Sequence, residues 1–321
     1  MINYIILIFI GFVLLIKGAD WLVDGSEKIA KRLHIPEIII GLTIVSIGTS
    51  MPELIVSVVS SINGHADMAI GNVIGSNLSN ILLILGLTAI IRPIALKKET
   101  KYIEIPIAVA STILLFILGN TSDHVLTRLD GLILVTGFVA FIAFTIYMTV
   151  KYCKENKISN TNNLNSEEAI PKHLILKSLA LIFVGIIGLK IGGDLVVNNA
   201  SEIAKMLNIS EKIISITIVS IGTSLPELIT SIMAAIHNDD DIAIGNIIGS
   251  SIFNILLILG VSSLISPISY SIEYNKDMVI AIIAVLLLNI YPFTGKKDSM
   301  TRINGTISLA LYLTYIIGLF I

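Results

Sequence analysis

Residues 41–54 read GLTIVSIGTSMPEL, and residues 215–228 repeat them as SITIVSIGTSLPEL, with 11 of 14 positions identical. Residues 69–86 read AIGNVIGSNLSNILLILG, and residues 243–260 repeat them as AIGNIIGSSIFNILLILG, with 14 of 18 positions identical. Both pairs are separated by 174 residues. Self-similarity at one fixed offset indicates that the chain consists of two copies of a single structural unit.

The composition places both copies in a membrane. Of the 321 residues, 55% are hydrophobic and only 14% are charged, and the mean hydropathy is +0.92. A soluble protein of this size needs a more polar surface. The 21 basic and 23 acidic residues nearly balance, which argues against a nucleic-acid binder. The single cysteine, Cys153, excludes an intramolecular disulfide framework and a multi-cysteine metal site.

Apolar runs long enough to cross a bilayer as helices recur along the whole chain. We expect an all-α polytopic membrane protein with ten transmembrane helices. The predicted spans cover residues 2–30, 36–62, 67–92, 104–119, 128–150, 174–204, 210–236, 242–267, 277–293 and 302–321.

The repeat divides these ten spans into two units of five. Residues 1–151 form the first predicted unit, residues 173–321 form the second, and the polar segment 152–172 links them. Because each unit has an odd number of spans, equivalent helices cross the membrane in opposite directions. Such inverted repeats are typical of secondary transporters, whose substrate site lies between the repeats near the midplane. The alternative is a duplicated helical bundle without a transport role.

The distribution of Lys and Arg predicts the orientation. If the N-terminus is outside, 16 of the 21 basic residues fall on cytoplasmic connections, as the positive-inside rule requires. Both termini are then outside and the 152–172 segment is cytoplasmic. The acidic turn Asp239–Asp241 also lies on a cytoplasmic connection. We interpret it as a solvated loop; the alternative is a group that attracts cytoplasmic cations.

Glu53 and Glu227 are the most informative polar residues, because each lies inside a long apolar run at an equivalent position. A carboxylate at membrane depth costs a few kcal/mol, even on the lenient insertion scale. Neither duplicated helix contains a basic residue that could neutralise it. Two carboxylates that meet at the midplane favour a hard cation such as Ca²⁺, which prefers oxygen ligands. The alternative is a pair of buried acids that only pack.

The first motif supplies further oxygen atoms beside each Glu. A Gly and a Pro within the motif disturb the helix, because Pro lacks an N–H group. We expect the carbonyl groups near Ser46 and Ser220 to lose their intrahelical partners and to become available to a cation. The neighbouring hydroxyl groups belong to Thr49, Ser50, Thr223 and Ser224.

The second motif places a Ser and an Asn on one helical face, because they are four residues apart. These pairs are Ser76 with Asn80 and Ser250 with Asn254. A G-x-x-x-G pattern in the same motif allows close helix packing. The segments contain no His or Cys, so Zn²⁺ and Cu⁺ are poor candidates. The two Asn residues could alternatively serve only for hydrogen bonding between helices.

With these motifs, GTS-[ML]-PE and GN-x-IGS-x-x-x-N, the chain resembles prokaryotic Na⁺/Ca²⁺ exchangers of the cation/Ca²⁺ exchanger superfamily. The resemblance covers nearly the whole chain and implies exchange of Na⁺ for Ca²⁺ by alternating access in a prokaryotic plasma (inner) membrane. It also implies that the first and sixth helices slide across a core of eight. The implied ligands are Glu53, Glu227, Thr49, Ser50, Ser76, Thr223, Ser224 and Ser250, with backbone oxygens of Ser46 and Ser220, and with Asn80 and Asn254 flanking the central site.

Two departures from the superfamily patterns refine this expectation. Many relatives, including K⁺-dependent ones, carry Asp at the position of Asn254, so co-transport of K⁺ is not favoured here. The H⁺/Ca²⁺ branch usually places an acid within the GN motif, which here continues with apolar residues after Asn72 and Asn246. The open alternatives are an H⁺/Ca²⁺ exchanger and a Ca²⁺-selective channel. The partners are Na⁺, Ca²⁺ and the lipid bilayer. The sequence indicates neither an enzyme, a cofactor nor an obligate protein partner.

Overall fold

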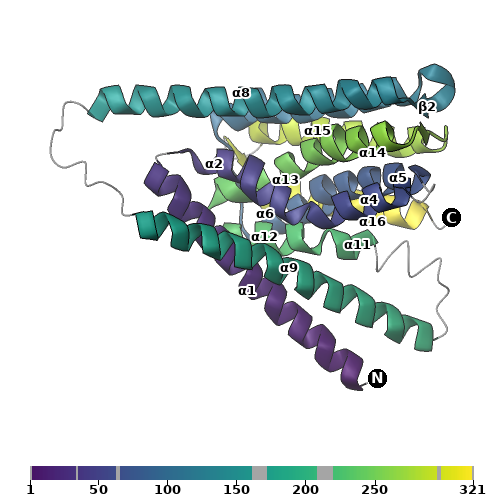
Figure 1. Ribbon diagram of the computed structural model, residues 1–321, viewed down its shortest axis with the longest axis horizontal. Coiled ribbons are helices and arrows are strands. Elements are labelled where there is room, and N and C mark those ends of the chain that lie inside the picture. The colour runs from purple at the N-terminus through teal and green to yellow at the C-terminus, as the bar shows by residue number, and fades with distance from the viewer. Residues whose placement is uncertain are drawn as a thin grey trace.

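The computed structural model describes residues 2–33, 35–62, 66–160, 172–207, 220–294 and 298–319. Helices dominate these residues, and most of them run roughly along one direction (Figure 1). The chain is therefore an all-α membrane protein, as predicted. The helical elements of its first half are α1 (Ile2–Leu33), α2 (Glu37–Ile40), η1 (Gly41–Val45), α3 (Ser46–Thr49), α4 (Met51–Ile62), α5 (Ala66–Leu78), η2 (Ser79–Ile84), α6 (Leu85–Ile91), η3 (Thr100–Glu104), α7 (Ile105–Gly119), η4 (Ser122–His124) and α8 (Arg128–Asn160).

The described elements of the second half follow largely the same order. Its helical elements are α9 (Lys172–Met206), α11 (Ser220–Thr223), α12 (Leu225–Ile236), α13 (Asp240–Phe253), η6 (Asn254–Leu259), α14 (Gly260–Ile265), α15 (Tyr274–Ile290), η7 (Tyr291–Phe293) and α16 (Arg302–Gly318). The segments η1, η2, η3 and η6 are π-helical, whereas η4 and η7 are short 3₁₀ turns.

Seven described helices are long and apolar enough to cross a membrane, and a bent pair makes an eighth. The bent pair joins Glu37–Thr49 to Met51–Ile62 at an angle of 49°. The predicted span at 210–236 is described only from residue 220 onwards, and α16 has 17 residues. The predicted total of ten spans therefore remains an expectation.

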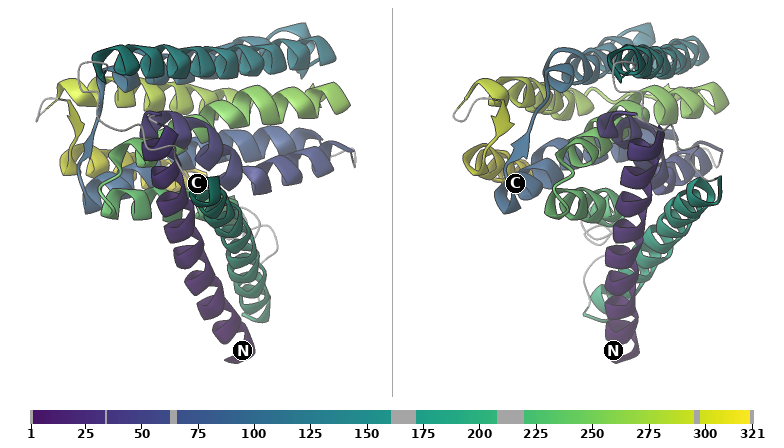
Figure 2. Two further views of the ribbon diagram at one scale, coloured as in Figure 1. Left: turned by 60° about the vertical axis from the view of Figure 1, so that its left-hand side comes forward. Right: turned by 90° about the vertical axis from the view of Figure 1, so that its left-hand side faces the viewer.

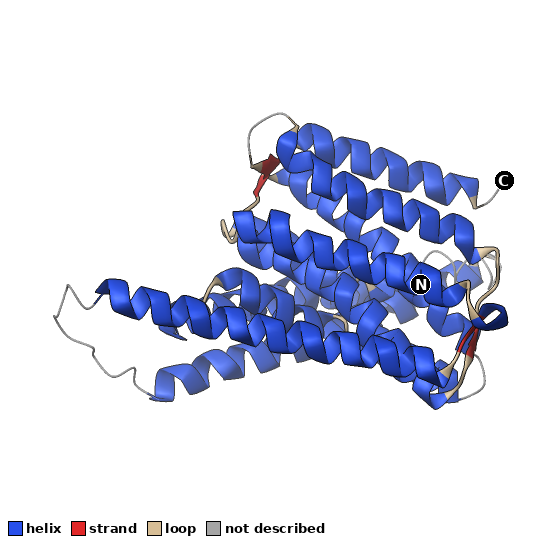
Figure 3. Cartoon of the chain, turned by 90° about the horizontal axis from the view of Figure 1, so that it is seen from above, coloured by secondary structure: helices blue, strands red, loops and turns tan. Residues whose placement is uncertain are grey.

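Two short antiparallel sheets show the inverted repeat directly. Strand β1 (Ile94–Ala95) pairs with β4 (Ser299–Met300), and β2 (Val125–Leu126) pairs with β3 (Ile268–Ser269). Adding 174 to the residue numbers of β1 gives β3, and adding it to those of β2 gives β4. The two sheets lie at opposite ends of the molecule (Figure 3). One pairing therefore occurs twice, once at each end, as an inverted repeat requires.

The caps of two helices follow the same offset. The Thr127 N–H and hydroxyl groups donate to Asp130 at the start of α8. Thr301 and Asn304 form the equivalent capping box at the start of α16. Such caps satisfy N–H groups that have no acceptor within the helix. Both repeats thus start the corresponding helix with the same local structure.

Helix α8 is longer than its predicted span. It continues to Asn160, so the beginning of the polar 152–172 segment is helical. Residues 161–171 lie outside the described part of the chain.

The helices differ strongly in burial. In the apolar stretch of Asp240–Ile265, 94% of the residues are buried, against 22% in Ile2–Lys31 and 17% in Arg128–Tyr152. Side chains of α1 and α8 such as Phe9, Leu132 and Val139 are exposed. Exposed apolar surfaces of this extent need a lipid environment.

Helices α1 and α9 lie side by side and project away from the remaining helices (Figure 2). Their backbones touch at glycine residues. A Cβ atom on Gly18 would lie 2.7 Å from the backbone N of Leu189, and one on Gly185 would lie 2.7 Å from the carbonyl O of Gly18. A larger residue at either position would force the helices apart. The α1–α9 pair is therefore one tightly packed unit at the side of the bundle.

Candidate cation-binding site

Breaks in the duplicated helices create the local geometry of the site. Ser50 interrupts the helix between α3 and α4, with φ −84° and ψ 9°, and Ser224 interrupts the equivalent helix between α11 and α12, with φ −90° and ψ 5°. Pro52 and Pro226 follow two residues later and offer no N–H group to the preceding turn. The π-helical segments η2 and η6 contain Asn80 and Asn254. Such wide turns occur frequently at functional sites.

The two predicted carboxylates meet in the interior. Glu53 and Glu227 are each 1% exposed, and Glu53 lies close enough to Glu227 to experience its charge. Within the described residues, no Lys or Arg pairs with either carboxylate. A buried pair of acids without a basic partner is unfavourable unless a cation or a proton compensates the charge.

Hydroxyl groups from one repeat face the carboxylate of the other. The Ser50 hydroxyl donates to Glu227 Oε1 at 2.8 Å, and Thr49 also faces Glu227. On the other side, Thr223 and Ser224 face Glu53. The structure therefore brings these four predicted hydroxyl residues together around the two acids, and each half of the site contains parts of both repeats.

Several buried oxygen atoms of the site have no hydrogen-bond partner. Each belongs to a residue that the motifs single out, and most occur in equivalent pairs. The atoms are Glu53 Oε2, Glu227 Oε2, Asn80 Oδ1, Asn254 Oδ1, Ser224 Oγ and Ser250 Oγ. Buried oxygens are normally hydrogen-bonded, so a set of unpaired ones is suited to a hard cation. Ser76 is buried as well, at 3% exposure on α5.

One expectation about the backbone is wrong. The carbonyl O of Ser46 keeps a helical partner, because it accepts from the Ser50 N–H at 3.0 Å and from the Thr49 hydroxyl at 3.3 Å. Pro52 has no N–H group to donate to the carbonyl four residues before it. The carbonyl that loses its helical donor is therefore that of Gly48. Ser220 is the first residue of α11, and its side chain lies outside the described set.

Asn246 is a residue of this site that the sequence analysis did not select. It is fully buried, and its Oδ1 accepts from the Thr49 hydroxyl at 3.0 Å. Its amide group donates to Ser231 Oγ at 2.9 Å. The equivalent Asn72 donates to Ser57 Oγ at 3.1 Å. The offset of 174 relates both Asn residues and both Ser residues, and that signal could have revealed them.

One Asn of the second motif, Asn254, meets Asn77 of the other repeat. Asn254 donates from its amide to Asn77 Oδ1 at 3.1 Å, and Asn77 donates to the carbonyl O of Ser251 at 3.1 Å. The alternative role of these Asn residues, hydrogen bonding between helices, is therefore present for Asn254. It uses the Asn254 amide nitrogen and leaves the side-chain oxygen free for another partner.

The G-x-x-x-G pattern brings the second motif against the first. A Cβ atom on Gly245 would lie 2.8 Å from the carbonyl O of Ile38, and one on Gly249 would lie 2.6 Å from Ser46 Oγ. Helix α13 of the second repeat thus packs directly on η1 and α3 of the first. This contact confirms that the glycines allow the Ser- and Asn-bearing helix to approach the helix that leads to Glu53.

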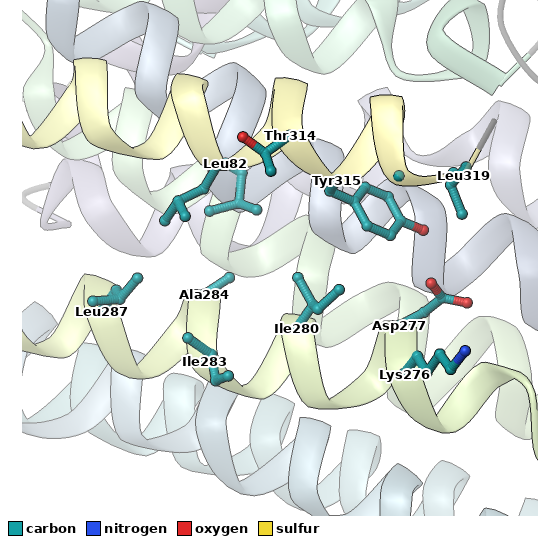
Figure 4. Close-up of a pocket in the computed structure, with 12 residues that line it drawn as sticks. Leu82, Lys276, Asp277, Ile280, Ile283, Ala284, Leu287, Thr314, Tyr315 and Leu319 are labelled. Carbon is teal, nitrogen blue, oxygen red and sulfur yellow. The ribbon is translucent and has the colours of Figure 1, made fainter. Parts of the chain in front are cut away.

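Other polar and hollow regions are different in character. A groove of about 400 Å³ between α15 and α16 is lined mostly by aliphatic side chains, with Asp277 and Tyr315 at one end (Figure 4). It offers no set of oxygen ligands.

The acidic turn at residues 239–241 is not the solvated loop that we expected, because Asp239 and Asp241 are only 7% and 6% exposed.

The inverted helical repeats, the bilayer-sized apolar helices and the buried, oxygen-rich centre define a multi-pass membrane protein with the architecture of a secondary transporter. Comparison with known proteins identifies the family. The family model described as sodium/calcium exchanger protein matches residues 3–147 and 177–321. The chain belongs to this family.

Individual relatives agree with that assignment. The putative antiporter CaxA of Alkalimonas amylolytica is 36% identical over 97% of this chain and 96% of its own length. The sodium/calcium exchanger MaX1 of Methanosarcina acetivorans is 31% identical over 99% of both chains. A structure of the sodium-calcium exchanger NCX_Mj superimposes with a TM-score of 0.83, at 33% identity and 98% coverage of each chain.

Proposed function

We propose that this protein exchanges Na⁺ for Ca²⁺ across the membrane by alternating access. The observation that carries the proposal is the pair of buried carboxylates, Glu53 and Glu227, which have no basic partner among the described residues. Each has one oxygen without a hydrogen bond. Family membership and the match to NCX_Mj support the same function.

The chemistry of the candidate ligands suits both ions. Ca²⁺ takes six to eight oxygen ligands, including carboxylates, amide oxygens and waters. The proposed ligand residues are Glu53, Glu227, Thr49, Ser50, Ser76, Asn80, Thr223, Ser224, Ser250 and Asn254, with the backbone oxygen of Ser220. The Ser46 carbonyl is left out of this set, because it already accepts two hydrogen bonds. No soft ligand occurs among them, which disfavours Zn²⁺ and Cu⁺.

The charge of this site predicts an electrogenic cycle. Two ionised Glu residues balance one Ca²⁺. Three Na⁺ on the same ligands carry one more positive charge, so a three-for-one exchange moves one net charge per turnover. Each such charge is worth about 2.3 kcal/mol per 100 mV of membrane potential. Membrane potential should therefore drive the exchange in addition to the Na⁺ gradient.

A cleft of about 250 Å³ offers an approach to the site. It extends from Lys190 and Asp194 on α9 to Thr223 and the two motif prolines, Pro52 and Pro226. Thr223 is itself a candidate ligand, and each of the two prolines directly precedes one of the two Glu residues. Because α9 forms one wall of the cleft, movement of the α1–α9 unit would open or close this approach.

The orientation follows from the sheets together with the basic residues. Sheet β1–β4 places the connections near residues 94 and 299 at one end, and β2–β3 places those near 125 and 268 at the other. The positive-inside rule assigns the first end to the cytoplasm. In this proposal, the protein lies in a prokaryotic plasma membrane with both termini outside. The cytoplasmic segment 152–172 joins the two repeats, which comprise residues 1–151 and 173–321.

Cysteine labelling tests this orientation. In a Cys153→Ser background, an impermeant reagent added to intact cells should label Thr121→Cys but not Lys98→Cys. Opening the cells should allow Lys98→Cys to react, which controls for the reactivity of that position. Labelling of Lys98→Cys in intact cells would reverse the proposed orientation.

Transport in proteoliposomes tests the function itself. Uptake of ⁴⁵Ca²⁺ is measured with outward gradients of Na⁺, K⁺ or H⁺ imposed one at a time. The proposal predicts saturable uptake with the Na⁺ gradient alone. Uptake driven by H⁺ would favour the H⁺/Ca²⁺ exchanger, and non-saturating flux without any counter-gradient would favour a channel. Either result would overturn the proposal.

A further inference from the structure

Three acidic side chains converge at a second place, outside the ligand set of the central site. Glu27 lies near the end of α1, Glu37 begins α2, and Asp239 precedes α13. One carboxylate oxygen from each lies within 4.8 Å of the other two. The chain passes from the end of α1 into α2 there (Figure 1). We call these three residues the α1-end cluster.

Asp239 supplies the independent sign of a missing ligand. It is 7% exposed, and its Oδ2 has no hydrogen-bond partner. As the N-cap residue of α13 it would normally accept from a backbone N–H of the first turn, but its side chain makes no such bond. Burial, and secondly the nearby Glu37, raise the pKa of Asp239 to about 6. Its carboxylate is therefore directed towards the other acids instead of its own helix.

The surrounding bases neutralise only part of the charge of the cluster. Lys31 pairs with Glu27, so the three carboxylates retain two formal negative charges. Other bases nearby already have acidic partners outside the cluster. Among the described side chains, Lys97 pairs with Asp241, Arg92 lies 3.9 Å from Asp240, and His237 lies 3.1 Å from Asp20. The remaining charge equals that of one divalent cation.

We propose that the α1-end cluster is a second Ca²⁺ site, separate from the central site. Ca²⁺ binds oxygens at about 2.3–2.6 Å, so ligands on opposite sides of the ion are about 5 Å apart. The three oxygens fit within that span. Mg²⁺ binds at about 2.0–2.1 Å and demands a smaller octahedral shell, so the cluster should prefer Ca²⁺. Waters would complete the coordination.

The position of this site gives it a mechanical consequence. Glu27 belongs to the α1–α9 unit, whereas Glu37 and Asp239 belong to segments packed in the bundle, one from each repeat. An ion held by all three residues ties α1 to both repeats. Occupancy of the cluster therefore restrains movement of α1 relative to the bundle, and bound Ca²⁺ would act on the exchange rate without being transported.

Calcium binding to the purified full-length protein tests the proposal. A Glu53→Gln/Glu227→Gln background removes the central site, so the result does not depend on the proposed function. Titration calorimetry with CaCl₂ should still detect one site in that background. Adding Asp239→Asn or Glu37→Gln should weaken its affinity at least tenfold. Adding Glu99→Gln, which changes an exposed acid outside the cluster, should leave the affinity unchanged.

Three results would overturn the proposal: no Ca²⁺ binding in the background variant, equal binding by Asp239→Asn and Glu99→Gln, or equal affinity for Mg²⁺ and Ca²⁺. If the background variant does not fold, equilibrium dialysis with ⁴⁵Ca²⁺ replaces it. The wild-type chain should then bind two Ca²⁺ and the Asp239→Asn variant one. A single Ca²⁺ bound by both would contradict the second site.

Discussion

The two halves of the central site have nearly the same sequence but different hydrogen bonds. Ser50 donates to Glu227 Oε1 at 2.8 Å, whereas the equivalent Ser224 faces Glu53 but forms no hydrogen bond of normal geometry. Burial differs too, because 72% of the residues in the apolar stretch of Ala69–Ile91 are buried, against 94% in Asp240–Ile265. Equivalent residues therefore occupy unequal surroundings in this structure.

The difference follows from the inverted repeat. If both repeats adopted identical conformations, the site would be equally accessible from both sides of the membrane or from neither. Alternating access requires that the repeats differ and that they exchange their conformations. In this view the equivalent residues Ser50 and Ser224 show the two conformations that each repeat adopts in turn, one with the hydrogen bond and one without it. The opposite state should interchange them.

The largest effect should come from the carboxylates, for which the two halves should behave alike. Either Glu53→Gln or Glu227→Gln removes half of the negative charge that balances Ca²⁺. Breaking a buried ion pair costs about 3–5 kcal/mol, so Ca²⁺ affinity should fall about 100-fold or more. Equilibrium binding of ⁴⁵Ca²⁺ to the purified variants measures this loss. Nearly normal affinity of either variant at the central site would remove that Glu from the ligand set.

The hydroxyl groups sharpen the comparison. A hydrogen bond to a charged group is worth about 1.5–3 kcal/mol, so Ser50→Ala should weaken Ca²⁺ exchange about 10-fold or more. If the halves exchange roles during transport, Ser224→Ala should have a similar effect, although its hydroxyl forms no hydrogen bond of normal geometry here. The KM for Ca²⁺ under both transport directions is the measurement. An effect of Ser50→Ala alone would show that the asymmetry is permanent.

Substitutions of Asn246 and Asn72 should have unequal effects, because the two residues are buried to different extents. Asn246 is fully buried and contacts Thr49 and Ser231, whereas Asn72 is less buried and contacts Ser57. Leaving a buried partner unsatisfied costs about 1–3 kcal/mol, so Asn246→Ala should lower both Tm and Ca²⁺ affinity more than Asn72→Ala. Thermal unfolding in detergent and Ca²⁺ titration provide both numbers. Equal losses would contradict the burial argument.

The smallest effect concerns K⁺ in the wild-type protein. In the proposed ligand set, Asn80 and Asn254 would contribute oxygens but no formal charge. The site would then carry two carboxylates and should not require K⁺. Replacing K⁺ by choline should leave Na⁺-driven Ca²⁺ flux unchanged. Asn254→Asp adds a third carboxylate, which should introduce sensitivity to K⁺ or to pH. Wild-type flux that disappears in choline and returns with K⁺ would disprove this charge count.

Much of the fold could be predicted because the repeat and the apolar runs are strong signals. The offset of 174 related the motifs, and the same offset relates strands β1 and β3 and the helix caps at Thr127 and Thr301. The full extent of α8 was missed, because its end consists of polar residues that membrane hydropathy does not detect. The polar end of α8 is helical although it has no apolar run that would have indicated a helix.

The site was predictable where polar residues interrupt apolar runs, as at Glu53 and Glu227. Contacts between segments distant in the sequence were not. Asn246 joins the candidate site because it meets Thr49 across 197 residues. Asp239 likewise lies within 4.8 Å of Glu27 and Glu37, which are distant in the sequence. The expectation for the Ser46 carbonyl was wrong because it placed the effect of Pro52 two residues too early in the helix, at Ser46 instead of Gly48.

The central claim is that two carboxylates handle Ca²⁺ and Na⁺ in turn, and charge movement tests it most directly. Proteoliposomes loaded with Na⁺ are diluted into ⁴⁵Ca²⁺ while the membrane potential is set independently. Exit of three Na⁺ for each Ca²⁺ that enters moves one positive charge outwards, so an inside-positive potential should accelerate uptake and an inside-negative potential should slow it. Glu99→Gln should respond like the wild-type protein. Uptake that does not depend on membrane potential, or that proceeds equally in Na⁺-free vesicles, would contradict the account.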